Sequence, residues 1–211
     1  MSIAYPAASP ETDLFGIEPT RLVLRPLLKL DEDQFFQLVS LNPDLPIEQN
    51  SQGEVVMMSP TGSAGGRRSG KIFQQLANWN DQHQRGEVFD AATLFRFPNN
   101  AALSPDASWV EKPRWERLTE EQQESIAPVC PNFVIELRSK TDRLKVLQEK
   151  LEEYLDNGVE LGWIIDPLLS QVHIYAAGQP VQVLDRPETV VGTGCVQGFV
   201  LYLKGIFPAA E

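Results

Sequence analysis

A strand, an amphipathic helix and a second strand follow one another over residues 132–166 of the 211-residue chain. Residues 132–138 and 160–166 are apolar runs typical of buried strands. Between them, residues 143–156 repeat apolar side chains at helical spacing, and Asn157-Gly158 ends the helix. Because more strand patterns occur on both sides of this unit, we predict an α/β fold in which a mixed β-sheet is flanked by helices.

The rest of the chain also alternates between strand and helix patterns. Its length suits a single domain, which we place at residues 21–211, after a proline-containing N-terminal tail at residues 1–20 that we expect to be flexible. The other predicted helices lie at residues 31–41 and 66–85, and the other predicted strands at residues 45–49, 54–59, 87–90, 93–97, 106–111, 171–175, 181–184 and 199–203.

The charge balance restricts the classes of function. The chain has 18 Lys and Arg residues against 29 Asp and Glu residues, which gives a net charge of −11. A protein that coats nucleic acid or binds an anionic membrane is normally basic, so this charge argues against both classes. An enzyme acting on nucleic acid stays compatible with it, because a bound divalent metal or a local basic groove offsets an acidic background.

We expect a cytoplasmic protein that binds no membrane. The two cysteines, Cys130 and Cys195, lack the spacing of a zinc site or a disulfide framework, and free thiols suit a reducing compartment. Residues 1–16 lack the pattern of a secretory signal. No apolar run approaches the ~20 residues that span a bilayer.

Residues 65–72 partly match a nucleotide-binding loop. Gly65, Gly70 and Lys71 fit the motif GxxxxGK[ST], but Ile72 stands where a hydroxyl should bind magnesium. We therefore interpret the stretch as the glycine-rich start of the helix at residues 66–85. A nucleotide hydrolase with a P-loop-like site is the less favoured alternative.

The most informative charged residue is an acid inside an apolar strand. Phe133, Ile135 and Leu137 share one face of their strand. Glu136 therefore projects from the other face, where a buried carboxylate needs a partner or a metal ion. The spacing leaves two interpretations open: a functional carboxylate, or a surface ion pair between Glu136 and Arg138.

A lysine flanks the buried face of the next helix. The apolar stripe of that helix consists of Leu144, Leu147, Leu151, Tyr154 and Leu155. At 100° per residue, Lys150 lies about 90° from the centre of the stripe, whereas Lys145 points away from it. On this evidence alone the simpler interpretation is a lysine whose stem packs on apolar surface while its charge stays in water.

Four stretches of the chain together resemble one bacterial family. They are residues 59–62 (SPTG), 104–110 (SPDASWV), 131–139 (PNFVIELRS) and 150–167 (KLEEYLDNGVELGWIIDP). In this order they are similar to the restriction-endonuclease-like family long catalogued as a domain of unknown function, within the PD-(D/E)XK nuclease superfamily. The resemblance extends over roughly residues 30–180.

The resemblance implies a restriction-endonuclease-like fold with metal-binding carboxylates at Asp106 and Glu136. The superfamily pattern places a lysine two residues after the glutamate, where this chain has Arg138. The family's alternative is a lysine on the following helix, which corresponds to Lys150. Relatives often carry an acid or a histidine after the SPTG turn, where this chain has Ser63-Ala64, and Glu54 is our substitute candidate for that metal ligand.

The activity implied by the resemblance is hydrolysis of DNA by a Mg²⁺-dependent endonuclease, with Mn²⁺ as a substitute metal. Asp106 and Glu136 would hold the metal, which lowers the pKa of an attacking water. Lys150 would orient that water or stabilise charge in the transition state. The alternative is a catalytically degenerate nuclease fold that binds DNA or a partner without cutting.

We also expect a homodimer, because related nucleases pair two active sites to cut both strands and closed two-fold assemblies are common. Residues 112–131 are polar, are bracketed by prolines and carry Trp115. Thr119 and Gln122 have the spacing of a capping box for a short helix there. This arm is expected either to contact the second subunit or to fold back over the active site.

Overall fold

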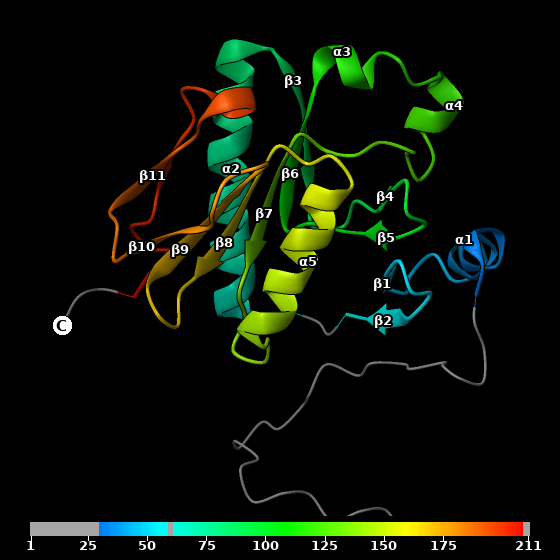
Figure 1. Cartoon of the computed structure of the whole chain (residues 1–211), viewed down its shortest axis with the longest axis horizontal. Coiled ribbons are helices and arrows are strands. Elements are labelled where there is room, and N and C mark those ends of the chain that lie inside the picture. Colours follow the sequence, from blue (N-terminus) through cyan, green and yellow to red (C-terminus); the bar gives the residue numbers. More distant parts are fainter. Residues whose placement is uncertain (1–29, 59–60, 209–211) are drawn as a thin grey trace, which may run out of the picture.

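A six-stranded mixed sheet forms the centre of the computed structural model, which describes residues 30–58 and 61–208 (Figure 1). Strand β7 (Phe133–Leu137), helix α5 (Leu144–Asp156) and strand β8 (Leu161–Asp166) form the predicted unit, and the two strands pair in parallel. The strand order is β10-β9-β8-β7-β6-β3, and all other neighbours pair antiparallel. The remaining strands are β3 (Gly86–Asp90), β6 (Ala107–Glu111), β9 (Gln171–Ala176) and β10 (Gln182–Asp185).

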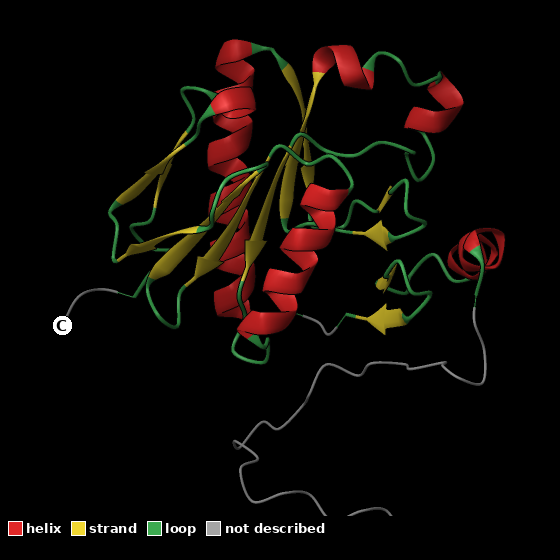
Figure 2. Cartoon of the chain, viewed as in Figure 1, coloured by secondary structure: helices red, strands yellow, loops and turns green. Residues whose placement is uncertain are grey.

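One long helix covers each face of this sheet (Figure 2). On one face, Leu76 and Trp79 of α2 (Ser63–His83) belong to the same buried cluster as Ile135 of β7. On the other face, Leu151 of α5 belongs to the same buried cluster as Val134. Successive residues of β7 thus enter different hydrophobic layers, as the alternation along a strand requires. The prediction of a mixed sheet flanked by helices is confirmed.

A smaller four-stranded sheet lies beside α5, with the strand order β2-β1-β5-β4 (Figure 1). A backbone hydrogen bond network pairs its strands, and the amide of Ser51 in the β1–β2 turn donates to Glu153 of α5. Helix α1 (Glu32–Leu41) begins at a capping box formed by Asp31 and Gln34, and its Phe35 is fully buried. The strands are β1 (Ile47–Gln49), β2 (Val55–Met57), β4 (Phe95–Arg96) and β5 (Ala102–Leu103).

The glycine-rich stretch at residues 65–71 lies inside α2. Its backbone amides therefore belong to helical turns and form no phosphate-binding loop. The interpretation of this stretch as a helix start is confirmed, and the basis for a P-loop-like nucleotide hydrolase is removed.

The arm at residues 112–131 packs against its own chain. It contains α3 (Lys112–Trp115) and α4 (Glu120–Gln123), and the predicted Thr119–Gln122 capping box is present. The ring of Trp115 lies 5.0 Å from that of Phe89 on β3, centroid to centroid. Trp115, which we expected at a contact with the second subunit or over the active site, thus packs partly against its own β3.

The short elements that were not predicted include helix α3, strand β5 and strand β11 (Thr189–Val191), which pairs with β12 (Val200–Tyr202). A 3₁₀ turn at Gly194–Val196 joins the last two. The predicted tail at residues 1–20 lies outside the described residues. Among the residues that are described, no helix is long and apolar enough to cross a membrane.

Gly162 of β8 lets α5 lie close to the sheet. A Cβ atom added at Gly162 would overlap Leu151 Cδ1 of α5 and would lie 3.2 Å from Val134 Cγ2 of β7. Because both neighbours are fully buried, neither has room to move away. The absence of a side chain at Gly162 therefore sets the spacing between β8 and the helix that carries Lys150.

We expect Gly162→Ala to lower the free energy of unfolding by about 1–3 kcal/mol, because it overpacks this layer. Gly70→Ala is the matched control: it lies in α2 with no atom within 4 Å of the added Cβ. That control should be neutral or stabilising by up to about 1 kcal/mol. Urea unfolding measures both values, and equal effects of the two substitutions would contradict this account of the α5–β8 spacing.

Candidate active site

Glu136 lies near the end of β7 and faces α5, on the opposite side of the sheet from Ile135 and Leu137. Only 4% of its surface is exposed. Its Oε1 atom accepts a hydrogen bond of 2.9 Å from the hydroxyl of Tyr154 and lies 3.0 Å from Lys150 Nζ. Two residues of α5, one turn apart, thus hold the same carboxylate oxygen.

Lys150 connects the two sheets. Its ammonium lies 2.9 Å from Glu48 Oε1 on β1 and donates to the backbone oxygen of Ser104, at 3.2 Å. Its side chain is only 15% exposed, whereas that of Lys145 on the same helix is 84% exposed. The flanking position inferred from helical geometry is therefore correct, but the charge of Lys150 is paired with carboxylates instead of lying in water.

Asp106 lies at the start of β6, next to β7. Its Oδ2 atom accepts a hydrogen bond of 2.7 Å from the backbone amide of Leu137, the residue after Glu136. This bond fixes one carboxylate oxygen of Asp106 beside the strand that carries Glu136. The structure therefore brings Asp106, Glu136 and Lys150 together.

The alternative of a surface ion pair between Glu136 and Arg138 is wrong. Arg138 Nη1 instead forms a 2.8 Å ion pair with Asp166 Oδ2 at the end of β8, and Asp166 is fully buried. Arg138 Nε also donates to the backbone oxygen of Asp142. Arg138 thus ties the β7–α5 loop to the neighbouring strand.

Glu48 was missed by sequence analysis, and the substitute ligand proposed there, Glu54, lies elsewhere. Glu54 accepts a hydrogen bond of 2.8 Å from the Asn50 side chain within the β1–β2 turn. Glu48 is buried, and its Oε1 accepts from the Ser104 amide as well as from Lys150. Its one local signal is that it is the only charged residue of the predicted strand at residues 45–49.

Burial dominates the protonation of this cluster. Desolvation raises the pKa of Glu136 to about 8, although Lys150 opposes the shift. Desolvation likewise raises the pKa of Asp106 to about 6, against the hydrogen bond from Leu137. For Lys150, burial lowers the pKa, but the carboxylates of Glu136 and Glu48 raise it more, so Lys150 stays charged.

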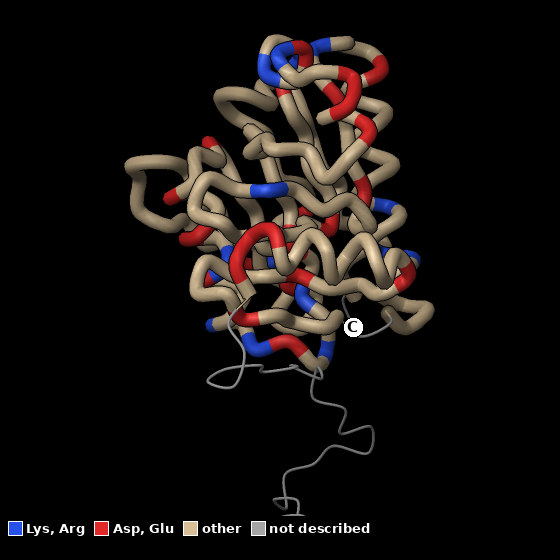
Figure 3. The backbone as a smooth tube through the Cα atoms, turned by 90° about the vertical axis from the view of Figure 1, so that its right-hand side faces the viewer, with Lys and Arg blue, Asp and Glu red and all other residues tan. Residues whose placement is uncertain are grey.

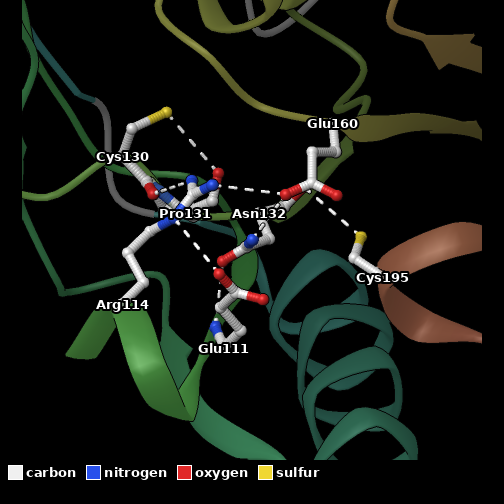
Figure 4. A network of polar contacts seen from close by, with 7 residues as sticks. All are labelled: Glu111, Arg114, Cys130, Pro131, Asn132, Glu160 and Cys195. Atoms are coloured by element: carbon white, nitrogen blue, oxygen red, sulfur yellow. Dashed lines mark hydrogen bonds and ion pairs between the residues drawn. The ribbon is translucent and has the colours of Figure 1, made fainter. Parts of the chain in front are cut away.

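A second polar network lies at the other end of β7 (Figure 4). The buried side chain of Asn132 accepts from the Glu111 amide and donates to Glu160. Cys130 and Cys195 border this network, and burial raises the pKa of both thiols to about 12. Neutral thiols are poor nucleophiles, so the network anchors the start of β7 and offers no thiolate chemistry.

The donor types of the first cluster fit a hard divalent cation. Glu48, Asp106 and Glu136 supply carboxylate oxygens, which Mg²⁺ prefers. Within residues 30–58 and 61–208, no group of three or more His, Cys, Asp or Glu side chains is already arranged to hold a metal ion. In this structure the ammonium of Lys150 joins Glu48 to Glu136.

The same fold occurs in a solved structure. A crystal structure of a putative nuclease belonging to DUF820 from Anabaena variabilis superposes with a TM-score of 0.71. The match covers 84% of this chain and 97% of that chain, at 20% sequence identity. This likeness confirms an α/β domain with a mixed sheet flanked by helices.

The sequence places the chain in a particular family. Residues 32–204 match the Uma2 family, which is described as putative restriction endonuclease. The chain therefore belongs to this family, as the motifs at residues 59–62, 104–110, 131–139 and 150–167 indicated. No curated protein matches the chain.

Replacing Glu136 tests the cost of its burial. We expect Glu136→Gln to unfold at a higher temperature than wild type in EDTA, with a difference that grows as the pH rises from about 5 to about 8. Folded Glu136 keeps its proton up to a pKa of about 8, whereas the unfolded value is 4.5. Between these two pKa values the unfolded chain binds fewer protons than the folded chain. The free energy of unfolding of the wild type therefore falls as the pH rises. The glutamine variant has no proton to lose at this position, so its free energy of unfolding does not fall for this reason.

The control is Glu149→Gln on the same helix, whose carboxylate is 60% exposed beside Lys145. Its difference from wild type should not change over the same pH range. Thermal melts of the three proteins at several pH values give the comparison. If the difference in melting temperature between Glu136→Gln and wild type shrinks as the pH rises, the ionised form of Glu136 stabilises the folded protein and this account is wrong.

Proposed function

We propose that this protein is a Mg²⁺-dependent DNA endonuclease that hydrolyses phosphodiester bonds, with Mn²⁺ as a substitute metal. The observation that carries the proposal is the buried cluster in which Glu48 and Glu136 meet the ammonium of Lys150. Asp106 is held beside this cluster through Leu137. Membership of a family described as putative restriction endonuclease supports the same assignment.

Each residue of the cluster has a role that suits its chemistry. Glu48, Asp106 and Glu136 would hold the Mg²⁺ ion. When bound, the metal would polarise the phosphodiester and lower the pKa of an attacking water. Lys150, which stays charged, would donate to the phosphate oxygen on which negative charge develops. Tyr154 would keep Glu136 in position through its hydroxyl.

The charge of the whole molecule makes a local cation necessary. The net charge is −11, and on the side shown in Figure 3 acidic residues are interspersed with basic ones. A DNA strand is repelled by such a molecule as a whole. A divalent cation at the carboxylates would reverse the sign of the field where the phosphate has to bind.

Cleavage of supercoiled plasmid tests the proposal. Wild type should nick DNA with Mg²⁺ or Mn²⁺ and not with EDTA. Asp106→Ala and Lys150→Met should each lower the rate by about 10² or more, because each removes a group that acts at the reacting phosphate. Lys145→Met, on the exposed face of the same helix, should cleave like wild type.

The alternative proposal, a nuclease fold that binds without cutting, predicts a different result. Purified wild type would then slow the migration of plasmid in a gel-shift assay and leave the plasmid intact with every metal. Such an outcome would refute the endonuclease assignment.

We further propose that the protein acts as a homodimer in the cytoplasm, because two sites related by a two-fold axis can cut both strands of a duplex. Both cysteines are free thiols in the structure, which suits a reducing compartment. Analytical ultracentrifugation should show a dimer at micromolar concentration. A monomer under those conditions would contradict this proposal.

A further inference from the structure

The ammonium of Lys150 is already engaged by three acceptors. A lysine ammonium carries three N–H donors. In this structure Nζ contacts three acceptors: Glu48 Oε1 at 2.9 Å, Glu136 Oε1 at 3.0 Å and the Ser104 backbone oxygen at 3.2 Å. Donation by Lys150 to a phosphate oxygen or a water would therefore compete with these contacts.

The two carboxylates have other donors that do not depend on Lys150. The amide of Ser104 donates to Glu48 Oε1 at 2.6 Å, and the hydroxyl of Tyr154 donates to Glu136 Oε1 at 2.9 Å. These donors come from the backbone and from a fully buried side chain. Glu48 and Glu136 would thus stay oriented if the ammonium left.

A divalent cation and the ammonium of Lys150 would compete for the carboxylate oxygens of Glu48 and Glu136. Both are cations, and a cation coordinated by Glu48 and Glu136 would lie within a few ångströms of Nζ at its present position. In a buried site, repulsion between like charges at such a distance is strong, because little water screens it. The carboxylates therefore favour one cation or the other.

We infer that Lys150 occupies the place of the metal in the metal-free protein, and that a divalent cation binds Glu48 and Glu136 by displacing its ammonium. This inference rests on the proposed function, because it concerns the same carboxylates. Displacement connects the two requirements of the reaction: Lys150 becomes free to donate to a phosphate when the metal site is filled. Without metal, the ammonium of Lys150 balances part of the negative charge of the cluster.

Competition predicts that removing the ammonium strengthens metal binding. Isothermal titration with Mg²⁺ compares wild type, Lys150→Met and Lys145→Met. Lys150→Met should bind Mg²⁺ about tenfold more tightly than wild type, within the usual range of coupling between two ligands. The control Lys145→Met, which lacks contact with the cluster, should bind like wild type.

A second measurement uses the wild-type protein, so it does not depend on the folding of the variant. Acetylation of lysines with an activated ester, followed by peptide mass spectrometry, reports the reactivity of each amine. Lys150 should be protected in EDTA and become several-fold more reactive in saturating Mg²⁺. The exposed Lys145 gives the internal standard, and its reactivity should not change.

The outcomes separate this inference from the proposed function. Equal or weaker Mg²⁺ binding by Lys150→Met, or a Lys150 amine that stays protected in saturating Mg²⁺, would overturn displacement and leave the endonuclease assignment intact. Failure of both wild type and variant to bind Mg²⁺ would overturn both. Tighter binding by the variant in a protein that does not cleave plasmid would support displacement and refute the endonuclease assignment.

Discussion

The ion pairs of Lys150 join three parts of the chain that are distant in sequence. Glu48 comes from the small sheet, Ser104 from the segment before β6, and Glu136 from the centre of the main sheet. Each carboxylate would be costly to bury alone, and so would the ammonium. The ammonium offsets part of this cost, and its contacts hold the small sheet and α5 beside β7. The position of every candidate site residue depends on this arrangement.

Apolar packing creates the layer in which the charges meet. Val134 and Glu136 project from the same face of β7, and α5 covers that face with Leu151 and Tyr154. Gly162 on the adjacent strand lets the helix approach. The hydrophobic layer excludes water from the carboxylates, and the same exclusion raises the pKa of Glu136 to about 8. Packing and site chemistry therefore have one cause.

Local patterns were sufficient for the centre of the fold and placed two side chains of the candidate site. Strand alternation indicated that Glu136 leaves the Phe133–Leu137 face, and helical spacing placed Lys150 at the edge of the buried stripe of α5. The role of Glu48 was not predictable in this way, because its partner Lys150 is 102 residues away and no local pattern encodes the contact. The sequence spacing also could not exclude an ion pair between Glu136 and Arg138. The actual partner of Arg138 is Asp166, which lies on another strand. The roles expected of Asp106 and Lys150 came from the resemblance, because no periodicity could indicate them.

Arg138 explains why a lysine on the helix suits this chain. Its guanidinium is held by Asp166 and by the backbone oxygen of Asp142, so it stabilises the β7–α5 loop and is not directed at the carboxylates. A cation on α5 reaches the same carboxylates from above, because the helix lies over the face of β7 from which Glu136 projects. Lys150 thus supplies the cation of this layer, because the packing of α5 brings its ammonium to Glu48 and Glu136 while Asp166 holds Arg138.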